Sequence, residues 1–305
     1  MATDEERNRA FRKERALRDR VRTAIQRDTV AEVKRLLRVA QDDIRQRLAG
    51  APSDFDTFVL PRLEAEIRRA LDTLERGAST ALETAAGRSW QAGIDLIDKP
   101  IEAGLALGSG PNVVLSSMLP TVDTRPLLAM RTFMTGRIAD ITATVANRIN
   151  TELGLVLIGT QTPGQAAGKV AEILRLNART RAVTIVRTEI GRAFSVAGQA
   201  RYSQAREILP GLKKQWRRSG KTHSRPDHDL ADGQVKEVDQ PFRVGGINLM
   251  FPRDPKAPAK HTINCGCSSL PFMESWEVAQ PGRQPFTAEE LAASRFRRDL
   301  QGALG

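Results

Sequence analysis

The stretch LRDRVRTAIQRDTVAEVKRLLRVAQDDIRQRL, residues 17–48, repeats apolar side chains every three or four positions among charged ones. At 3.6 residues per turn, this spacing gathers the apolar side chains on one face and predicts a long amphipathic helix. A second run of the same kind covers residues 55–74, and its pattern loosens beyond Gly87. A third long helix is predicted for residues 125–157. The N-terminal part of the chain is therefore expected to consist of long helices, of which the first two pair.

Turn and capping signals mark the ends of these helices. The GSGP sequence at residues 108–111 predicts a turn. The TPGQ sequence that begins at Thr162 supplies an N-cap, a proline at the first helical position and a capping-box acceptor. It predicts a helix that runs to about residue 174, and a further helix is expected over residues 180–208.

The composition of the sequence changes near Pro210. Every histidine and cysteine lies beyond this residue, together with many glycines and prolines. Residues 235–238, 242–244 and 248–251 are short β-like runs, and Gly245-Gly246 between the last two is a hairpin signal. This part is therefore expected to form a small α+β fold.

The predicted fold class is mostly α: a long-helix N-terminal region followed by a small α+β C-terminal module. We expect three parts, a helical region at residues 1–210, the α+β module at residues 211–285 and a basic helical tail at residues 286–305. A capping box that begins at Thr287 predicts the start of the tail helix.

The positive charge is concentrated in one segment. The chain carries a formal net charge of +11, and residues 175–225 hold thirteen Lys or Arg against two Glu, which equals that whole excess. Such a segment is typical of a surface that faces a polyanion, with contacts to phosphates and no reading of base sequence. The alternative is a solvated helix face whose charge only aids solubility. The candidate DNA-binding residues are Arg181, Arg187, Arg192, Arg201, Arg206, Lys213, Lys214, Arg217 and Arg218.

All three histidines and both cysteines lie within residues 223–267. His228, His261, Cys265 and Cys267 would supply two imidazoles and two thiolates, the ligand types of a tetrahedral structural zinc site. A zinc ion would then staple a module too small for a large core. The alternative is that the imidazoles form ordinary hydrogen bonds and the thiols pack as small apolar groups. His223 is expected to be exposed.

The carboxylates around His228 allow two interpretations. Asp227, Asp229 and Asp232 could orient an imidazole, or they could be turn residues. The chain contains no HExxH, Walker or GxSxG motif, and Glu237 is the only glutamate between His223 and Cys267. We therefore do not expect an enzyme.

Several classes of protein are excluded. No apolar stretch approaches the roughly 20 residues that a spanning helix needs, so no membrane segment is expected. The first fifteen residues are highly charged and do not resemble a secretory signal, which predicts a cytoplasmic start. Two cysteines separated by one residue do not form a disulfide framework.

A set of sequence blocks resembles a known family. In order along the chain, these are RTEIGRAF (187–194), KKQW (213–216), HDLADGQ (228–234), PF (241–242), FPRDP (251–255) and INCGC (263–267). They resemble the Mu F-like head morphogenesis family, the minor head proteins of tailed phages, and cover about residues 182–271.

The resemblance implies a virion component inside the head. It implies association with the portal protein, and with a scaffold or the major capsid protein, in the host cytoplasm during assembly, and a role in DNA packaging or ejection. Some family members carry C-P-x-C where this chain has residues 225–228, so that His228 stands at the second cysteine and Arg225 replaces the first. This correspondence supports His228, Cys265 and Cys267 as ligands.

Three functions follow from these observations. The leading one is a minor capsid protein that contacts packaged DNA through residues 175–225. The alternative is a zinc-dependent hydrolase or nuclease that uses His228, Cys265 and Cys267. A third is a DNA-binding regulator, for which the chain shows no helix-turn-helix signature.

Overall fold

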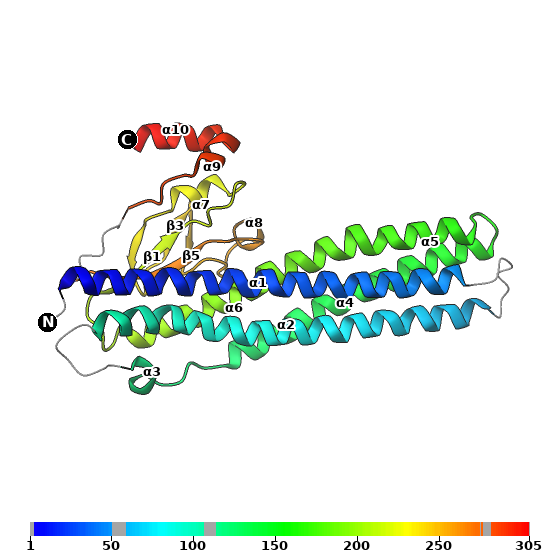
Figure 1. The fold of residues 1–305 in the computed structure, drawn as a ribbon, viewed down its shortest axis with the longest axis horizontal. Coiled ribbons are helices and arrows are strands. Elements are labelled where there is room, and N and C mark those ends of the chain that lie inside the picture. The colour runs from blue at the N-terminus through cyan, green and yellow to red at the C-terminus, as the bar shows by residue number, and fades with distance from the viewer. Residues whose placement is uncertain (1–2, 51–58, 107–113, 275, 277–281, 305) are drawn as a thin grey trace. The chain divides into compact units, whose positions relative to one another are not determined.

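The N-terminal part of the molecule is helical, as the periodicity predicts. The computed structural model describes residues 3–50, 59–106, 114–274, 276 and 282–304. The predicted helix start at residue 55 and the predicted turn at residues 108–111 lie outside the described residues. The first four helices are α1 (Asp4–Ala49), α2 (Val59–Leu105), the short α3 (Leu115–Met118) and α4 (Arg125–Leu157) (Figure 1).

The α2 helix differs from the expectation that its pattern would loosen beyond Gly87. It continues without a break to Leu105, although it contains Pro100. Ala92 and Gly93 lie here among large buried residues such as Trp90 and Leu96, at the point where α6 (Arg179–Ala205) approaches closely. A Cβ atom at Gly93 would lie only 2.2 Å from the carbonyl oxygen of Phe194. The weak apolar pattern therefore reflects close helix packing.

The capping signal at Thr162 is confirmed. The Gln165 amide donates to Thr162 Oγ1 at 3.3 Å, and the Thr162 amide donates to Gln165 Oε1 at 2.9 Å. The helix that starts here was expected to end near residue 174, but it continues beyond that residue. Its buried apolar face continues through a π-helical turn, so one rod forms from α5 (Pro163–Glu172), η1 (Ile173–Ala178) and α6 (Arg179–Ala205).

The C-terminal module is built on a three-stranded antiparallel sheet, in which β1 (Leu212–Arg217) lies between β2 (Val235–Glu237) and β5 (Ser268–Met273), beside a two-stranded hairpin. The hairpin and β2 confirm the predicted strands, with Gly245 and Gly246 at positive φ in the turn. The two longest strands were not predicted, because β1 carries charged residues and β5 contains Pro271. The strands are β1 (Leu212–Arg217), β2 (Val235–Glu237), β3 (Phe242–Val244), β4 (Ile247–Leu249) and β5 (Ser268–Met273).

In the described part of the chain, two short helices lie between strands of the module, and two more helices follow β5. The capping box at Thr287 is confirmed, with Thr287 Oγ1 accepting from the Glu290 amide at 3.2 Å. These helices are α7 (Pro226–Leu230), α8 (Ala259–Thr262), α9 (Ala288–Ala293) and α10 (Arg295–Leu304).

The predicted fold class, mostly α with a small sheet-containing C-terminal module, is confirmed. The chain forms two compact units that do not follow sequence order. The first comprises Met1–Ile25, Gly87–Leu127 and Ile190–Gly305, and the second comprises Gln26–Ala86 and Leu128–Glu189. None of the described helices combines the length and the apolar character needed to cross a membrane.

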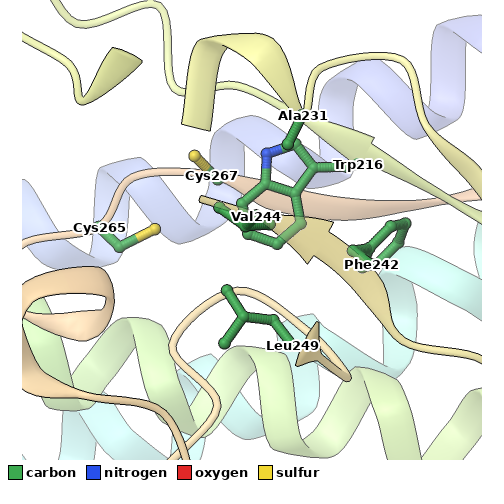
Figure 2. Close-up of a cluster of buried hydrophobic side chains, with 7 residues drawn as sticks. All are labelled: Trp216, Ala231, Phe242, Val244, Leu249, Cys265 and Cys267. Carbon is green, nitrogen blue, oxygen red and sulfur yellow. The ribbon is translucent and has the colours of Figure 1, made fainter. Parts of the chain in front are cut away.

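The core of the module is a small cluster around Trp216 (Figure 2). The Trp216 ring meets the rings of Phe242 and His228 edge-on, with centroid distances of 5.3 and 5.6 Å. Both cysteines belong to this cluster. Its buried members are Trp216, Ala231, Phe242, Val244, Leu249, Cys265 and Cys267.

Candidate metal centre

Three of the four predicted metal ligands meet inside the module. His228 lies on α7, where Pro226 occupies the first turn, and Cys265 and Cys267 lie in the loop that leads into β5. His228 Nδ1 lies 3.6 Å from Cys265 Sγ and 3.5 Å from Cys267 Sγ. The potential ligand atoms of the three residues all lie within 4.8 Å of one another, and all three side chains are buried.

These distances fit a tetrahedral zinc site. Bonds of about 2.3 Å to sulfur and 2.0–2.1 Å to nitrogen place adjacent sulfur and nitrogen ligands about 3.6 Å apart in a tetrahedron. The two nitrogen–sulfur separations match that edge, and an imidazole with two thiolates is a donor set that zinc prefers. The group could therefore bind a metal with little movement of its ligands.

His261, the fourth predicted ligand, lies beside this group and outside it. Its ring stacks on His228, with a centroid distance of 5.7 Å and an interplanar angle of 6°. Among the described residues, neither ring nitrogen of His261 has a hydrogen-bond partner, although the side chain is buried. Burial, together with the nearby His228, lowers the pKa of His261. His261 is thus a neutral, buried imidazole whose two ring nitrogens have no hydrogen-bond partner among the described residues.

The structure also shows where the remaining histidine, His223, and two of the aspartates near His228 lie. His223 is exposed, as predicted. Asp229 accepts from Arg297, and Asp232 accepts from Arg217 and from the Arg218 amide. The hypothesis that these two aspartates orient an imidazole by a direct hydrogen bond is therefore wrong, because their oxygens accept from arginines.

Asp227 lies close to the hairpin turn. A Cβ atom at Gly245 would lie 2.3 Å from Asp227 Oδ2 and 2.9 Å from His261 Cε1. Gly245 also has a φ of 56°. Only glycine fits this position without strain, because it accepts positive φ and leaves room for both neighbours.

Four basic side chains hold the loop that carries the cysteines. Each donates to one of four consecutive backbone carbonyls, which have no partners in a regular helix or strand. These contacts are Arg225 Nη2 to Ile263 O, Lys221 Nζ to Asn264 O at 2.7 Å, Arg253 Nη1 to Cys265 O at 2.7 Å, and Arg22 Nη2 to Gly266 O at 2.8 Å.

Sequence reasoning missed Arg22 and Arg253. Arg253 lies within the FPRDP block, which marked the position without revealing its role, and adopts a φ of 68°. Its other guanidinium nitrogen donates to Ser195 Oγ on α6 at 2.7 Å. Arg22 lies on α1, far away in sequence, and no local signal connects it with the cysteines.

The two thiols differ in acidity. A hydrogen bond from Cys267 lowers the pKa of Cys265 well below its usual value, and the same bond raises the pKa of Cys267. The Arg253 guanidinium favours the thiolate form of both residues. Cys265 is therefore the first thiol to lose its proton.

The structure corrects the predicted DNA-binding set at three positions. Arg201, Lys214 and Arg218 are buried, so they are not available to phosphates. Arg201 forms a two-pronged ion pair with Asp98, at 2.7 and 2.6 Å. Lys214 Nζ donates to Met250 O at 2.7 Å, and burial lowers its pKa to about 8. Arg218 pairs with Glu290. The prediction was wrong at these positions because a count of charged residues cannot distinguish an exposed basic side chain from one that is buried against a carboxylate or a carbonyl.

The other six candidate DNA-binding residues differ in their exposure and in their ion-pair partners. Arg217, Lys213 and Arg206 form ion pairs with carboxylates of the module or the adjoining loop. Arg192 is half-buried, and its Nε donates to Arg253 O at 3.4 Å. Arg181 and Arg187 are exposed on α6, and among the described residues no carboxylate pairs with either of them.

Comparisons with known proteins agree with the resemblance in the sequence. Residues 144–270 match the family described as Phage Mu protein F like protein. The uncharacterized protein YqbB of Bacillus subtilis (strain 168) is 39% identical over 117 residues, which are 37% of this chain and 36% of that protein. The NAD(+)–arginine ADP-ribosyltransferase EFV of Enterococcus faecalis (strain ATCC 700802 / V583) is 34% identical over 93 residues.

The second match covers 30% of this chain and 19% of the transferase. The matched regions thus span about a third and a fifth of the two relatives. No solved structure matches this chain significantly. The matched family region begins on α4 and ends in β5, and it contains His228, Cys265 and Cys267. Residues 144–270 of this chain are therefore a Phage Mu protein F-like region, which confirms the resemblance.

Proposed function

We propose that this chain is a minor head protein of a tailed phage, which acts in head morphogenesis at the portal vertex and resides inside the head. The match of residues 144–270 to the Phage Mu protein F-like family carries this proposal. The portal protein is the expected partner, and a scaffold or the major capsid protein is a further one. The grouped ligand residues His228, Cys265 and Cys267 support a zinc-stapled module, and the exposed arginines of α6 support a surface for DNA.

Quantitative mass spectrometry of gradient-purified phage particles tests the proposal. We expect a few copies of this chain per particle, measured as a ratio to the portal subunit. A chain that is abundant in the infected-cell lysate and absent from the particles would contradict a place in the virion.

We propose that DNA contact runs through Arg181 and Arg187, which are exposed and free of carboxylate partners among the described residues. Each phosphate contact contributes about 0.9 to the slope of log K against log salt concentration. We expect the double variant Arg181→Ala/Arg187→Ala to reduce this slope by about 2. Arg35→Ala is the matched control, because Arg35 is exposed but already pairs with Glu32. An unchanged slope in the double variant would contradict the proposed DNA contact at these two arginines.

We propose that His228, Cys265 and Cys267 bind a structural zinc ion, with His261 as the fourth ligand. Bound zinc would supply folding free energy to the module, because the unfolded chain has no preformed site. Burial of all three grouped ligands favours a closed structural site over a catalytic one, which keeps a position open to substrate. It therefore disfavours the alternative of a zinc-dependent hydrolase or nuclease.

Metal analysis of the purified chain tests the zinc site. We expect one zinc per chain, its loss in Cys265→Ser, and no change in His223→Ala, which removes an exposed histidine outside the group. His261→Ala separates the fourth ligand from the other three and should weaken binding without abolishing it. A wild-type chain that is purified with zinc in the medium and contains none would overturn the site.

A further inference from the structure

The C-terminal segment, residues 282–304, docks on the module through two buried ion pairs. Arg218 pairs with Glu290, and Arg297 pairs with Asp229 at 3.1 Å, and at most 2% of any of these four side chains is exposed. The ring of Phe286 lies near both guanidinium groups, 4.3 Å from that of Arg218 and 5.6 Å from that of Arg297. Surface ion pairs contribute little to stability, whereas breaking a buried pair leaves a charge without compensation. The segment is therefore an integral part of the module.

Two sets of hydrogen bonds connect Arg297 with the elements that carry the proposed ligands, and the first set involves α7. Arg297 Nε donates to Asp229 Oδ2, and its Nη2 donates to Ser224 Oγ at 2.8 Å. Ser224 Oγ in turn donates to the other oxygen of Asp229. Asp229 directly follows the ligand His228 on α7. The contact thus fixes the backbone of the short helix that presents the imidazole.

The second set involves the loop between β1 and α7. Arg297 donates to the backbone carbonyls of Lys221, at 2.7 Å, and Thr222. The side chains of Lys221 and Arg225 in this loop donate to Asn264 O and Ile263 O, directly before the cysteines.

The two loops also pack closely at Gly266, which lies between the cysteines. A Cβ atom at Gly266 would lie 2.7 Å from Ser219 Cβ and 2.9 Å from Lys221 Cε. The loop between β1 and α7 therefore packs directly against the loop that carries both thiols.

We propose that Arg297 is a positioning residue of the metal centre, and that metal binding and docking of α9–α10 strengthen each other. This inference rests on the proposed zinc site. Residues that hydrogen-bond a metal ligand directly typically contribute 10–100-fold to metal affinity, and Arg297 acts one contact further out, through Asp229 and the carbonyls of Lys221 and Thr222. Linkage makes the effect reciprocal: a docked segment tightens zinc binding, and bound zinc tightens docking by the same factor.

Zinc affinity of the full chain, measured by competition with a chromophoric chelator, tests the first half of the linkage. We expect Arg297→Ala to bind zinc about 10-fold more weakly than the wild type, at the low end of that range. Arg297→Lys keeps the charge and loses the planar fork, so it should recover only part of the affinity. Arg298→Ala is the matched control, because Arg298 lies on the same helix, is exposed and donates within the segment to Leu291 O. Wild-type affinity in Arg297→Ala would overturn the inference.

Hydrogen exchange of the wild-type chain tests the second half without any substitution. After chelation of zinc, amides of α9 and α10 should exchange faster, while those of α5 in the other compact unit should keep their rates. Unchanged exchange in α9–α10 after confirmed release of zinc would overturn the linkage and leave the zinc site standing. A wild-type chain that binds no zinc would overturn both.

Discussion

In the compact unit formed by Gln26–Ala86 and Leu128–Glu189, every described arginine and lysine is at least partly exposed. Its core is made mainly of aliphatic side chains on long helices, whose backbone groups are satisfied within each helix. Among its described residues, the other unit buries six arginine or lysine side chains: Arg22, Arg201, Lys214, Arg218, Arg253 and Arg297.

The difference follows from backbone geometry. The loops around the candidate metal centre have carbonyls without regular partners, and a buried carbonyl without a donor costs about 1–3 kcal/mol. Arginine carries five donors, so one side chain can satisfy several carbonyls and a carboxylate together. The unit that contains the candidate metal centre therefore buries arginines, whereas the core of the other unit consists mainly of aliphatic side chains.

The largest test of this contrast is Arg201→Ala. It leaves Asp98 buried without its cation, and burial already raises the pKa of this carboxyl group. We expect the free energy of unfolding to fall by about 3–5 kcal/mol in chemical denaturation. The control Arg179→Ala, on the same helix but exposed, should change it by less than about 0.5 kcal/mol. Equal effects at the two positions would contradict the distinction between the units.

Glycine substitutions should give opposite signs in the two units. A Cβ at Gly93 would collide with the Phe194 carbonyl, so Gly93→Ala should destabilise by about 1–3 kcal/mol. Nothing lies within 4 Å of a Cβ at Gly136 on α4, and Gly136→Ala should stabilise by up to about 1 kcal/mol through helix propensity. Thermal unfolding of both variants measures the pair, and a stable Gly93→Ala would show that α2 and α6 are less tightly packed.

The buried Lys214 predicts a pH dependence. Its pKa of about 8 lies below the ordinary value of 10.5, because burial disfavours the charged form. Between these values the unfolded chain binds more protons, so this residue makes stability rise with pH from about 8 to 10.5. The contribution is at most about 1.4 kcal/mol per pH unit. Lys214→Met should lack this rise in denaturation curves at pH 8 and 9, and an identical pH dependence would place the ammonium group in water.

The smallest effect is expected at the exposed arginines of α6. Arg181→Ala and Arg187→Ala should each change the free energy of unfolding by less than about 0.5 kcal/mol, because neither side chain has a carboxylate partner among the described residues. Chemical denaturation checks this expectation. A loss above 1 kcal/mol would indicate a structural role and weaken their assignment to DNA.

The sequence by itself determined the features that depend on neighbouring residues. Apolar spacing predicted the long helices, the capping boxes at Thr162 and Thr287 were confirmed, and two glycines marked the hairpin. The clustered histidines and cysteines indicated a metal site, and the structure brings His228, Cys265 and Cys267 together. These signals are local, because a helix, a cap or a turn is decided within a few residues.

Only the tertiary structure decided how the basic residues are used. Nothing in the sequence separates Arg201, which pairs with Asp98 across 103 residues, from Arg187, which is exposed on the same helix. The same holds for Arg22, whose partner Gly266 is 244 residues away. An arginine is equally compatible with solvent and with a buried carboxylate or carbonyl. Its environment is therefore fixed by packing partners that the local sequence does not contain.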